Sequence, residues 1–175
     1  MIRKLLAAIA VVIAAAIASP ASAQVRITVD EGHLNPMPIA VVDFLGGSAA
    51  AQQVGRDLSG VIRANLERSA LFRAIPSNAF IERIQALAVP PRFADWKIID
   101  AQGLVIGEVT PLQDGRIRID FRLYDVFAEQ QLTGFSYTTT PDNWRRIAHR
   151  ISDQIYEHLT GERGYFDTRV VFVSE

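Results

Sequence analysis

The chain has 175 residues, of which 49% are hydrophobic and 21% are charged, and its formal net charge at pH 7 is −1. This balance is typical of a globular protein and argues against a nucleic-acid binder, which needs concentrated positive charge. The sequence has no cysteine, which excludes a disulfide and a lipid-acceptor thiol.

The first 23 residues have the organisation of a cleavable export signal. A basic pair at residues 3–4 precedes an unbroken apolar run over residues 5–18. Ala21-Ser22-Ala23 supplies the small residues that signal peptidase recognises, so we expect cleavage after Ala23. The apolar run is shorter than the roughly 20 residues of a membrane-spanning helix, which disfavours the alternative of an uncleaved anchor. We therefore predict an exported protein that starts at Gln24 and has no membrane anchor.

The remaining 152 residues have the size of a single domain with one core. Loss of the signal lowers the count of Lys plus Arg from 18 to 16, while the count of Asp plus Glu stays at 19. The formal net charge of the mature chain is therefore −3. We find no internal repeat and no low-complexity tract.

The new amino terminus alternates between apolar and polar residues. Val25, Ile27 and Val29 face one way, and the polar residues between them face the other. This pattern predicts a half-buried strand made of Gln24, Val25, Arg26, Ile27, Thr28, Val29 and Asp30. A loop with one glycine and two prolines follows over residues 32–38.

The next elements are a buried strand and an amphipathic helix. Residues 39–44 are apolar enough for a buried strand, and Gly46-Gly47-Ser48 turns the chain into a helix. The apolar stripe of this helix consists of Val54, Leu58, Val61, Ile62 and Leu66. We also expect a short helix around residues 80–87, ended by the prolines at residues 90–91, whereas residues 92–100 stay ambiguous.

A hairpin and a second long helix complete the pattern. Residues 103–110 and 116–125 predict two strands joined by a turn at Asp114-Gly115, a dipeptide that favours positive φ angles. Residues 132–139 predict a further antiparallel strand. Thr140 and Pro141 are suited to begin a helix, and Gly161 is suited to end it. Its predicted buried stripe is Trp144, Ile147, Ala148, Ile151, Ile155 and Leu159.

This order of elements predicts an α+β fold, an α/β two-layer arrangement. We expect a mixed, mostly antiparallel sheet with the helices packed on one face. A last strand over residues 169–173 is also expected.

Three patterns in the sequence are candidates for catalytic or metal sites. Gly46-Gly47-Ser48 lacks both the glycine after a hydrolase nucleophile and the Gly-Lys-Ser/Thr ending of a phosphate loop, so a helix-entry turn is favoured. His149, Asp153 and Glu157 share one helix face, but neighbouring arginines oppose a bound cation, which favours a solvated face. Asp43 and Glu108 are the best candidates for acid–base chemistry, although strand-end carboxylates are usually solvated or capping. We expect no catalytic residue, no metal and no cofactor.

Several segments, in order and with matching spacing, resemble the family of TolB amino-terminal domains, which belong to a periplasmic component of the Tol-Pal system. They are Gln24–Asp30 with Gly32, Pro38–Val42, Val105–Val109, Phe121–Asp125, and Asp153–Gly161 leading through Gly164 and Phe166 to Thr168-Arg169. The resemblance implies an interaction protein of the periplasm rather than an enzyme. It implies a role in linking the inner and outer membranes, in outer-membrane integrity and in invagination during cell division.

The resemblance also implies partners and boundaries. The mature amino-terminal strand, Gln24–Asp30, is expected to bind the inner-membrane protein TolA. We expect a signal peptide at residues 1–23, a TolB amino-terminal α/β domain at residues 24–166, and the start of a missing β-propeller at residues 167–175. Because the family's propeller binds the lipoprotein Pal, Pal binding by this chain is in doubt. A monomer that binds no nucleic acid is expected.

One alternative of a different class stays open, namely an exported small-ligand-binding protein or enzyme that uses the open face of the sheet. A deep pocket with convergent polar groups would favour that alternative. A flat sheet face with a free amino-terminal strand would favour the interaction protein.

Overall fold

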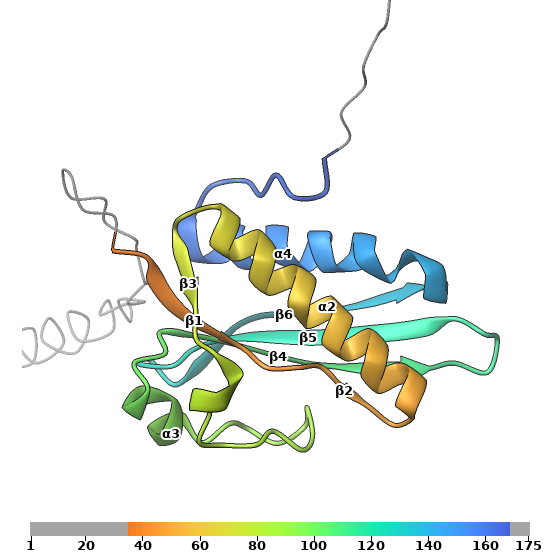
Figure 1. Cartoon of the computed structure of the whole chain (residues 1–175), viewed down its shortest axis with the longest axis horizontal. Coiled ribbons are helices and arrows are strands. Elements are labelled where there is room, and N and C mark those ends of the chain that lie inside the picture. The colour runs from red at the N-terminus through yellow and green to blue at the C-terminus, as the bar shows by residue number, and fades with distance from the viewer. Residues whose placement is uncertain (1–34, 169–175) are drawn as a thin grey trace, which may run out of the picture.

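The computed structural model describes residues 35–168, and within them six strands form one open, mixed sheet (Figure 1). The order across the sheet is β3-β1-β4-β5-β6, and the short β2 pairs with β4. The strands are β1 (Met37–Val41), β2 (Leu45–Gly46), β3 (Phe72–Ala74), β4 (Gly103–Pro111), β5 (Ile117–Asp125) and β6 (Gln130–Thr139). The predicted signal peptide, residues 1–23, and the predicted strand over residues 169–173 lie outside the described residues.

Parallel and antiparallel pairing occupy different halves of the sheet. β1 lies between β3 and β4 and is parallel to both, and β2 is also parallel to β4. The longer pairs, β4 with β5 and β5 with β6, are antiparallel. The expectation of a mixed, mostly antiparallel sheet is therefore confirmed.

Two long helices, α2 (Ala49–Arg68) and α4 (Trp144–Thr160), lie side by side on one face of the sheet, as Figure 1 shows. The predicted α+β fold with helices packed on one face is thus confirmed. A third helix, α3 (Phe93–Ile98), is short and lies on the other side of the sheet. No described helix is both long and apolar enough to cross a membrane.

The sheet separates two hydrophobic clusters. The larger cluster fills the space beneath α2 and α4, where Leu58, Ile62, Ile151 and Ile155 are fully buried. The smaller cluster lies on the opposite face, around the fully buried Trp96 of α3. Both faces of the sheet are thus covered at the end near α3. At the other end, the face away from α2 and α4 carries polar side chains, among them Glu108, Arg118 and Asp120.

The local signals of the hairpin and of α4 are confirmed. Gly115 in the turn between β4 and β5 has a φ of 81°, and Gly161 at the end of α4 has a φ of 79°. Pro141 opens a single turn of 3-10 helix (Pro141–Asn143) ahead of α4, and the side chain of Thr140 makes no capping hydrogen bond. The predicted position of the helix start is therefore confirmed, whereas the predicted capping by Thr140 is wrong.

The helix predicted around residues 80–87 is wrong. Beyond one 3-10 turn (Ser77–Ala79), this segment is irregular, and the helix forms later, as α3. Phe80, Ile84 and Leu87, which have helical spacing, do pack against the smaller cluster, but from an irregular backbone. Tertiary packing of these side chains overrides the local periodicity.

The predicted strand over residues 39–44 ends early, at Val41, because the chain turns there to bury Phe44. A Cβ atom at Gly107 of β4 would overlap the ring of Phe44, and one at Gly55 of α2 would overlap its carbonyl oxygen. Because these two glycines have no side chain, Phe44 can pack between β4 and α2.

Candidate interaction surface

The segment expected to bind a partner, Gln24–Asp30, lies outside the described residues. Its assignment therefore stays a prediction. The described chain begins shortly before β1, an inner strand between β3 and β4. The candidates for catalytic and metal sites all lie within the described residues.

Gly46-Gly47-Ser48 forms a helix-entry turn, as predicted. Ser48 is the N-cap of α2, and its Oγ accepts a hydrogen bond from the N–H of Ala51 at 3.2 Å. This hydroxyl therefore satisfies one of the free donors at the start of the helix. Its position is explained by capping.

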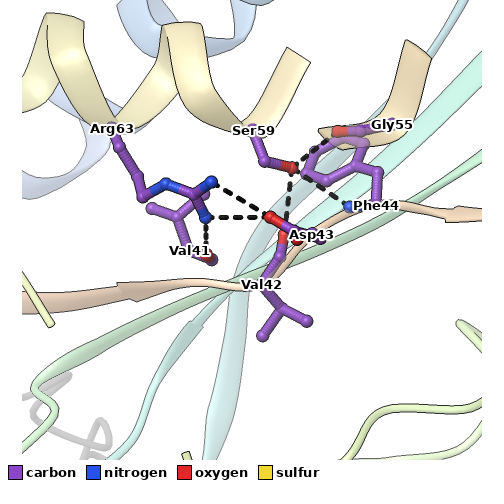
Figure 2. A network of polar contacts seen from close by, with 7 residues as sticks. All are labelled: Val41, Val42, Asp43, Phe44, Gly55, Ser59 and Arg63. Atoms are coloured by element: carbon purple, nitrogen blue, oxygen red, sulfur yellow. Dashed lines mark hydrogen bonds and ion pairs between the residues drawn. The ribbon is translucent and has the colours of Figure 1, made fainter. Parts of the chain in front are cut away.

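Asp43 is held by an ion pair at the end of β1, as Figure 2 shows. Both terminal nitrogens of Arg63 lie 3.0 Å from Asp43 Oδ1, and Arg63 Nη1 also donates to the carbonyl oxygen of Val41 at 2.9 Å. Since Arg63 belongs to α2, this contact fastens the helix to the end of the strand. The side chain of Asp43 remains 46% exposed, so the ion pair adds little to stability.

A buried hydroxyl lies beside this ion pair (Figure 2). Ser59 Oγ accepts a hydrogen bond from the N–H of Phe44 at 3.0 Å. The same atom lies 2.9 Å from the carbonyl oxygen of Gly55 and 3.1 Å from that of Val42, and its single proton can be donated to one of them at a time. This hydroxyl satisfies the backbone where the chain leaves β1.

Asp43 and Glu108 line the same open hollow, between the start of α2 and the sheet. The structure thus brings together the two carboxylates that the sequence singled out. Apart from this pair, the described residues that line the hollow are glycines, apolar residues, two glutamines and one arginine, Arg56. None of these side chains is suited to act as a nucleophile. The hollow is thus an open, polar depression of the surface, and one of its two carboxylates, Asp43, is already paired with Arg63.

The three candidate ligands on α4 do not act as one group. His149 Nδ1 lies 2.9 Å from Asn65 Nδ2, at the interface with α2. Asp153 accepts hydrogen bonds from the N–H groups of Phe166 at 2.7 Å and Asp167 at 3.1 Å. Glu157 is exposed, whereas His149 and Asp153 are half-buried and hydrogen-bonded, so the expected solvated face is only partly solvated. Among residues 35–168, no cluster of three or more His, Cys, Asp or Glu could hold a metal ion.

The edge strand β6 is the most unusual surface of the described chain. It is ten residues long, its sequence QQLTGFSYTT carries no charge and no proline, and among residues 35–168 it pairs only with β5. Proteins usually protect such an edge with charged residues, proline or a cover, because its free N–H and C=O groups can pair with another chain. Within the described residues, one irregularity of register, between Leu123 and Tyr124, interrupts the β5–β6 pairing.

Aromatic side chains accompany this edge on the helix side of the sheet. Phe135 and Tyr137 of β6 stand beside Phe121 of β5, with ring centroids 6.1 to 6.4 Å apart. Phe135 is 44% exposed. The guanidinium of Arg150, on α4, lies 4.8 Å from the centre of the Tyr137 ring. Aromatic residues and arginine are the types enriched at protein–protein interfaces.

The sequence did not reveal this surface. The absence of charge over residues 130–139 was visible, but whether a strand lies at the edge of a sheet depends on the pairing of all the strands. In the sequence, Arg150 is one of the arginines that oppose a bound cation, and Arg122 is part of the segment Phe121–Asp125 that carries the family resemblance. Their positions beside β6 follow only from the structure.

Comparison with known proteins gives the family. Residues 25–132, more than half of the chain, match the TolB amino-terminal domain. A crystal structure of TolB from Acinetobacter baumannii superposes with a TM-score of 0.60 and 26% sequence identity, over 75% of this chain and 30% of that one. This chain is thus similar to less than a third of the length of that protein.

Two other solved structures are more distant. The PelC dodecamer from Paraburkholderia phytofirmans has a TM-score of 0.48 and 15% identity over 77% of this chain and 96% of that one. Lipoprotein GNA1162 from Neisseria meningitidis has a TM-score of 0.47 and 17% identity over 71% of this chain and all of that one. The extent of the sequence match decides the assignment, and the chain belongs to the family of TolB amino-terminal domains.

Proposed function

We propose that this chain is a periplasmic interaction component of the Tol-Pal system and binds TolA through residues 24–30. In this role it contributes to the link between the inner and outer membranes, to outer-membrane integrity and to invagination during division. The observation that carries the proposal is the family match, which begins at Val25 and so covers nearly all of the proposed binding segment.

The chemistry of the segment supports binding by strand addition. Val25, Ile27 and Val29 form an apolar row, with polar residues between them. An extended segment of this kind adds to the edge of a partner's sheet through its backbone, and one row of its side chains supplies specificity. In general, a segment at a chain terminus is connected at one end only, so its release disturbs few other contacts.

Two forms of the protein test this proposal, one beginning at Gln24 and one beginning at Glu31. Both are expected to fold, because the described core begins at β1. Isothermal titration calorimetry with the periplasmic domain of TolA is expected to show binding only for the longer form. Equal affinity of the two folded forms would place the TolA contact elsewhere.

Single substitutions refine the same experiment. Ile27→Pro removes a backbone donor and an apolar side chain, so binding to TolA is expected to be lost. Ile27→Ala is expected to weaken binding, whereas the matched change Thr28→Ala, on the polar row, is expected to have little effect. The opposite ranking would mean that the polar row faces TolA.

The periplasmic location is part of the proposal and has its own test. The organisation of residues 1–23 supports export followed by cleavage after Ala23. Mass spectrometry of the periplasmic fraction is expected to give a mature chain that begins at Gln24. Retention of residues 1–23 in the exported protein would contradict this.

A further inference from the structure

The free edge of β6 has features that the proposed TolA segment does not explain. We propose that this edge binds a second partner, an extended segment of another protein that carries the pattern Glu-x-apolar-Glu and pairs antiparallel to β6. The surface lies within the described residues and is separate from residues 24–30.

The direction of the backbone groups of β6 follows from the hairpin. Leu112 N donates to Arg116 O at 2.8 Å and closes the turn. Because hydrogen-bonded pairs alternate along an antiparallel ladder, β5 uses Arg118, Asp120 and Arg122 to bond β4 and the residues between them to bond β6. The backbone of β6 therefore bonds β5 at Phe135 and Tyr137.

It follows that Gly134, Ser136 and Thr138 direct their N–H and C=O groups away from β5. Within residues 35–168, no backbone or side-chain hydrogen bond reaches these groups from another element. Gly134 and Ser136 are exposed. An added strand therefore finds three successive sites for backbone pairing, which is the requirement for strand addition.

The charge around the edge indicates what kind of segment fits. β6 itself brings no charge. Arg150 lies over the ring of Tyr137 on the helix side, and it forms no ion pair with any residue that the structure describes. Arg150 is exposed and can meet a carboxylate on an incoming strand, which competes there with Asp153, Glu157 and Asp167, since these line the same hollow as Arg150 and Tyr137.

A second cation lies on the opposite side of the sheet. Arg122 of β5 is directly opposite Gly134 of β6, and a Cβ at Gly134 would lie 3.4 Å from Arg122 Cγ. The side chain of Arg122 therefore lies close to the glycine and is half-buried, and it shares this space with the amide of Gln131, whose Nε2 would lie 3.0 Å from the same Cβ. Arg122 too forms no ion pair within the described residues, whereas its neighbour Arg118 is paired with Asp120 at 2.9 Å.

These positions define the pattern. A carboxylate opposite Tyr137 meets Arg150 on the helix side, and a carboxylate opposite Gly134, three residues along, meets Arg122 on the other side. The residue opposite Phe135 shares the helix side and meets an exposed aromatic ring, so an apolar side chain fits there. In an antiparallel partner these requirements give Glu-x-apolar-Glu.

A second copy of this chain fits the edge less well. In a pairing of β6 with β6 of another copy, neither strand supplies a carboxylate for Arg122 or Arg150, because the sequence of β6 carries no charge. The segment at residues 24–30 does not supply the pattern either, since its only carboxylate is Asp30.

The probes are two short capped peptides that differ only in charge, with Glu-Thr-Val-Glu or Lys-Thr-Val-Lys at the centre. The protein is the chain beginning at Gln24, and the tested site on β6 is separate from residues 24–30, so the outcome is independent of the proposed function. The Glu peptide is expected to bind at least about tenfold more tightly. Residue-resolved hydrogen exchange is expected to show new protection at Gly134, Ser136 and Thr138.

Two kinds of variant locate the site. The double change Arg122→Glu and Arg150→Glu is expected to reverse the preference toward the Lys peptide, whereas Arg56→Glu, an exposed change on α2, is expected to leave it unchanged. Ser136→Pro removes an outward donor while it leaves the bonds to β5, so a folded Ser136→Pro protein is expected to lose peptide binding. Circular dichroism checks that each variant is folded.

Equal affinity for both peptides, protection on another element, or unchanged preference in the double variant would overturn the proposal. Protection of the same three amides without peptide would also overturn it, since another part of the chain or a second copy would then occupy the edge. Sedimentation at rising protein concentration separates those two cases.

Discussion

Glu82 Oε2 accepts the indole N–H of Trp96 at 2.7 Å, and the same oxygen accepts the backbone N–H of Arg92 at 2.9 Å. One carboxylate thus joins the irregular segment after β3 to both the start and the middle of α3. Trp96 is fully buried, so its N–H depends on this partner. The contact explains how a segment without regular structure is fixed over one face of the sheet.

Glu82→Ala is expected to lower the free energy of unfolding by about 1–3 kcal/mol, because it leaves the buried indole N–H unsatisfied. Glu82→Gln keeps an acceptor oxygen and is expected to cost less. Denaturant unfolding monitored by circular dichroism measures both. Glu67→Ala, an exposed change on α2, is the control and is expected to stay within about 0.5 kcal/mol of the parent. A Glu82→Ala protein as stable as this control would contradict the role of the contact.

Gly107→Ala is expected to destabilise the protein by about 1–3 kcal/mol or more, because the added methyl group overlaps the buried ring of Phe44. Gly60→Ala is a matched control on α2, where an added Cβ meets no atom within 4 Å. It is expected to raise stability by up to about 1 kcal/mol, since alanine favours helix more than glycine does. Urea unfolding compares the two, and equal stability would mean that Phe44 moves aside at little cost.

Much of the fold could be predicted because its signals are local. The Asp114-Gly115 turn, the alternation of residues 116–125 and the glycine at the end of α4 each specify a conformation over a few residues. The end of β1 at Val41 could not be predicted, because it depends on space made for Phe44 by glycines from two other elements. Residues that are distant in sequence decide such contacts.

The helix expected at residues 80–87 failed for a related reason. Phe80, Ile84 and Leu87 have the spacing of an apolar helix face. The same side chains can also pack against the smaller cluster from an irregular backbone, and the structure shows this second arrangement. The hydrogen bond that the indole N–H of Trp96 donates to Glu82 favours the irregular backbone. The candidate surface on β6 was beyond prediction because an edge is a property of the complete strand order.

Tyr137 is expected to make stability fall at alkaline pH. Burial raises the pKa of Tyr137 above its usual value of 10, and Arg150 opposes this while Asp153 adds to it. The unfolded chain therefore loses the phenolic proton first, at about pH 10. The stabilising contribution is complete below that pH and is lost as the pH rises through the folded-state pKa.

Unfolding free energies measured at about pH 9 and about pH 11 test this. Tyr137→Phe is expected to reduce the loss of stability between the two, because the variant has no phenol to ionise. Tyr165→Phe is the control, since the side chain of Tyr165 is 46% exposed. An identical pH dependence in the parent and in Tyr137→Phe would show that other groups cause the loss.

Asp153 is expected to hold the segment after α4 against the helix. Its two oxygens accept the N–H groups of Phe166 and Asp167, and Arg146 lies 3.3 Å from the carboxylate of Asp167. A Cβ at Gly164 would overlap Asp153, so the chain passes closest to the helix at this glycine. Asp153→Ala is therefore expected to release residues 162–168 while α4 stays folded.

Residue-resolved hydrogen exchange measures the release. In Asp153→Ala, the amides of Phe166 and Asp167 are expected to exchange about 5 to 100 times faster, which corresponds to the loss of one or two hydrogen bonds to a charged group. Asp153→Asn keeps one acceptor oxygen and is expected to give a smaller increase. Glu157→Ala, one turn further along the same helix and exposed, is expected to leave both amides unchanged. If Asp153→Ala also leaves them unchanged, the aromatic contacts among Tyr156, Tyr165 and Phe166 hold the segment without the carboxylate.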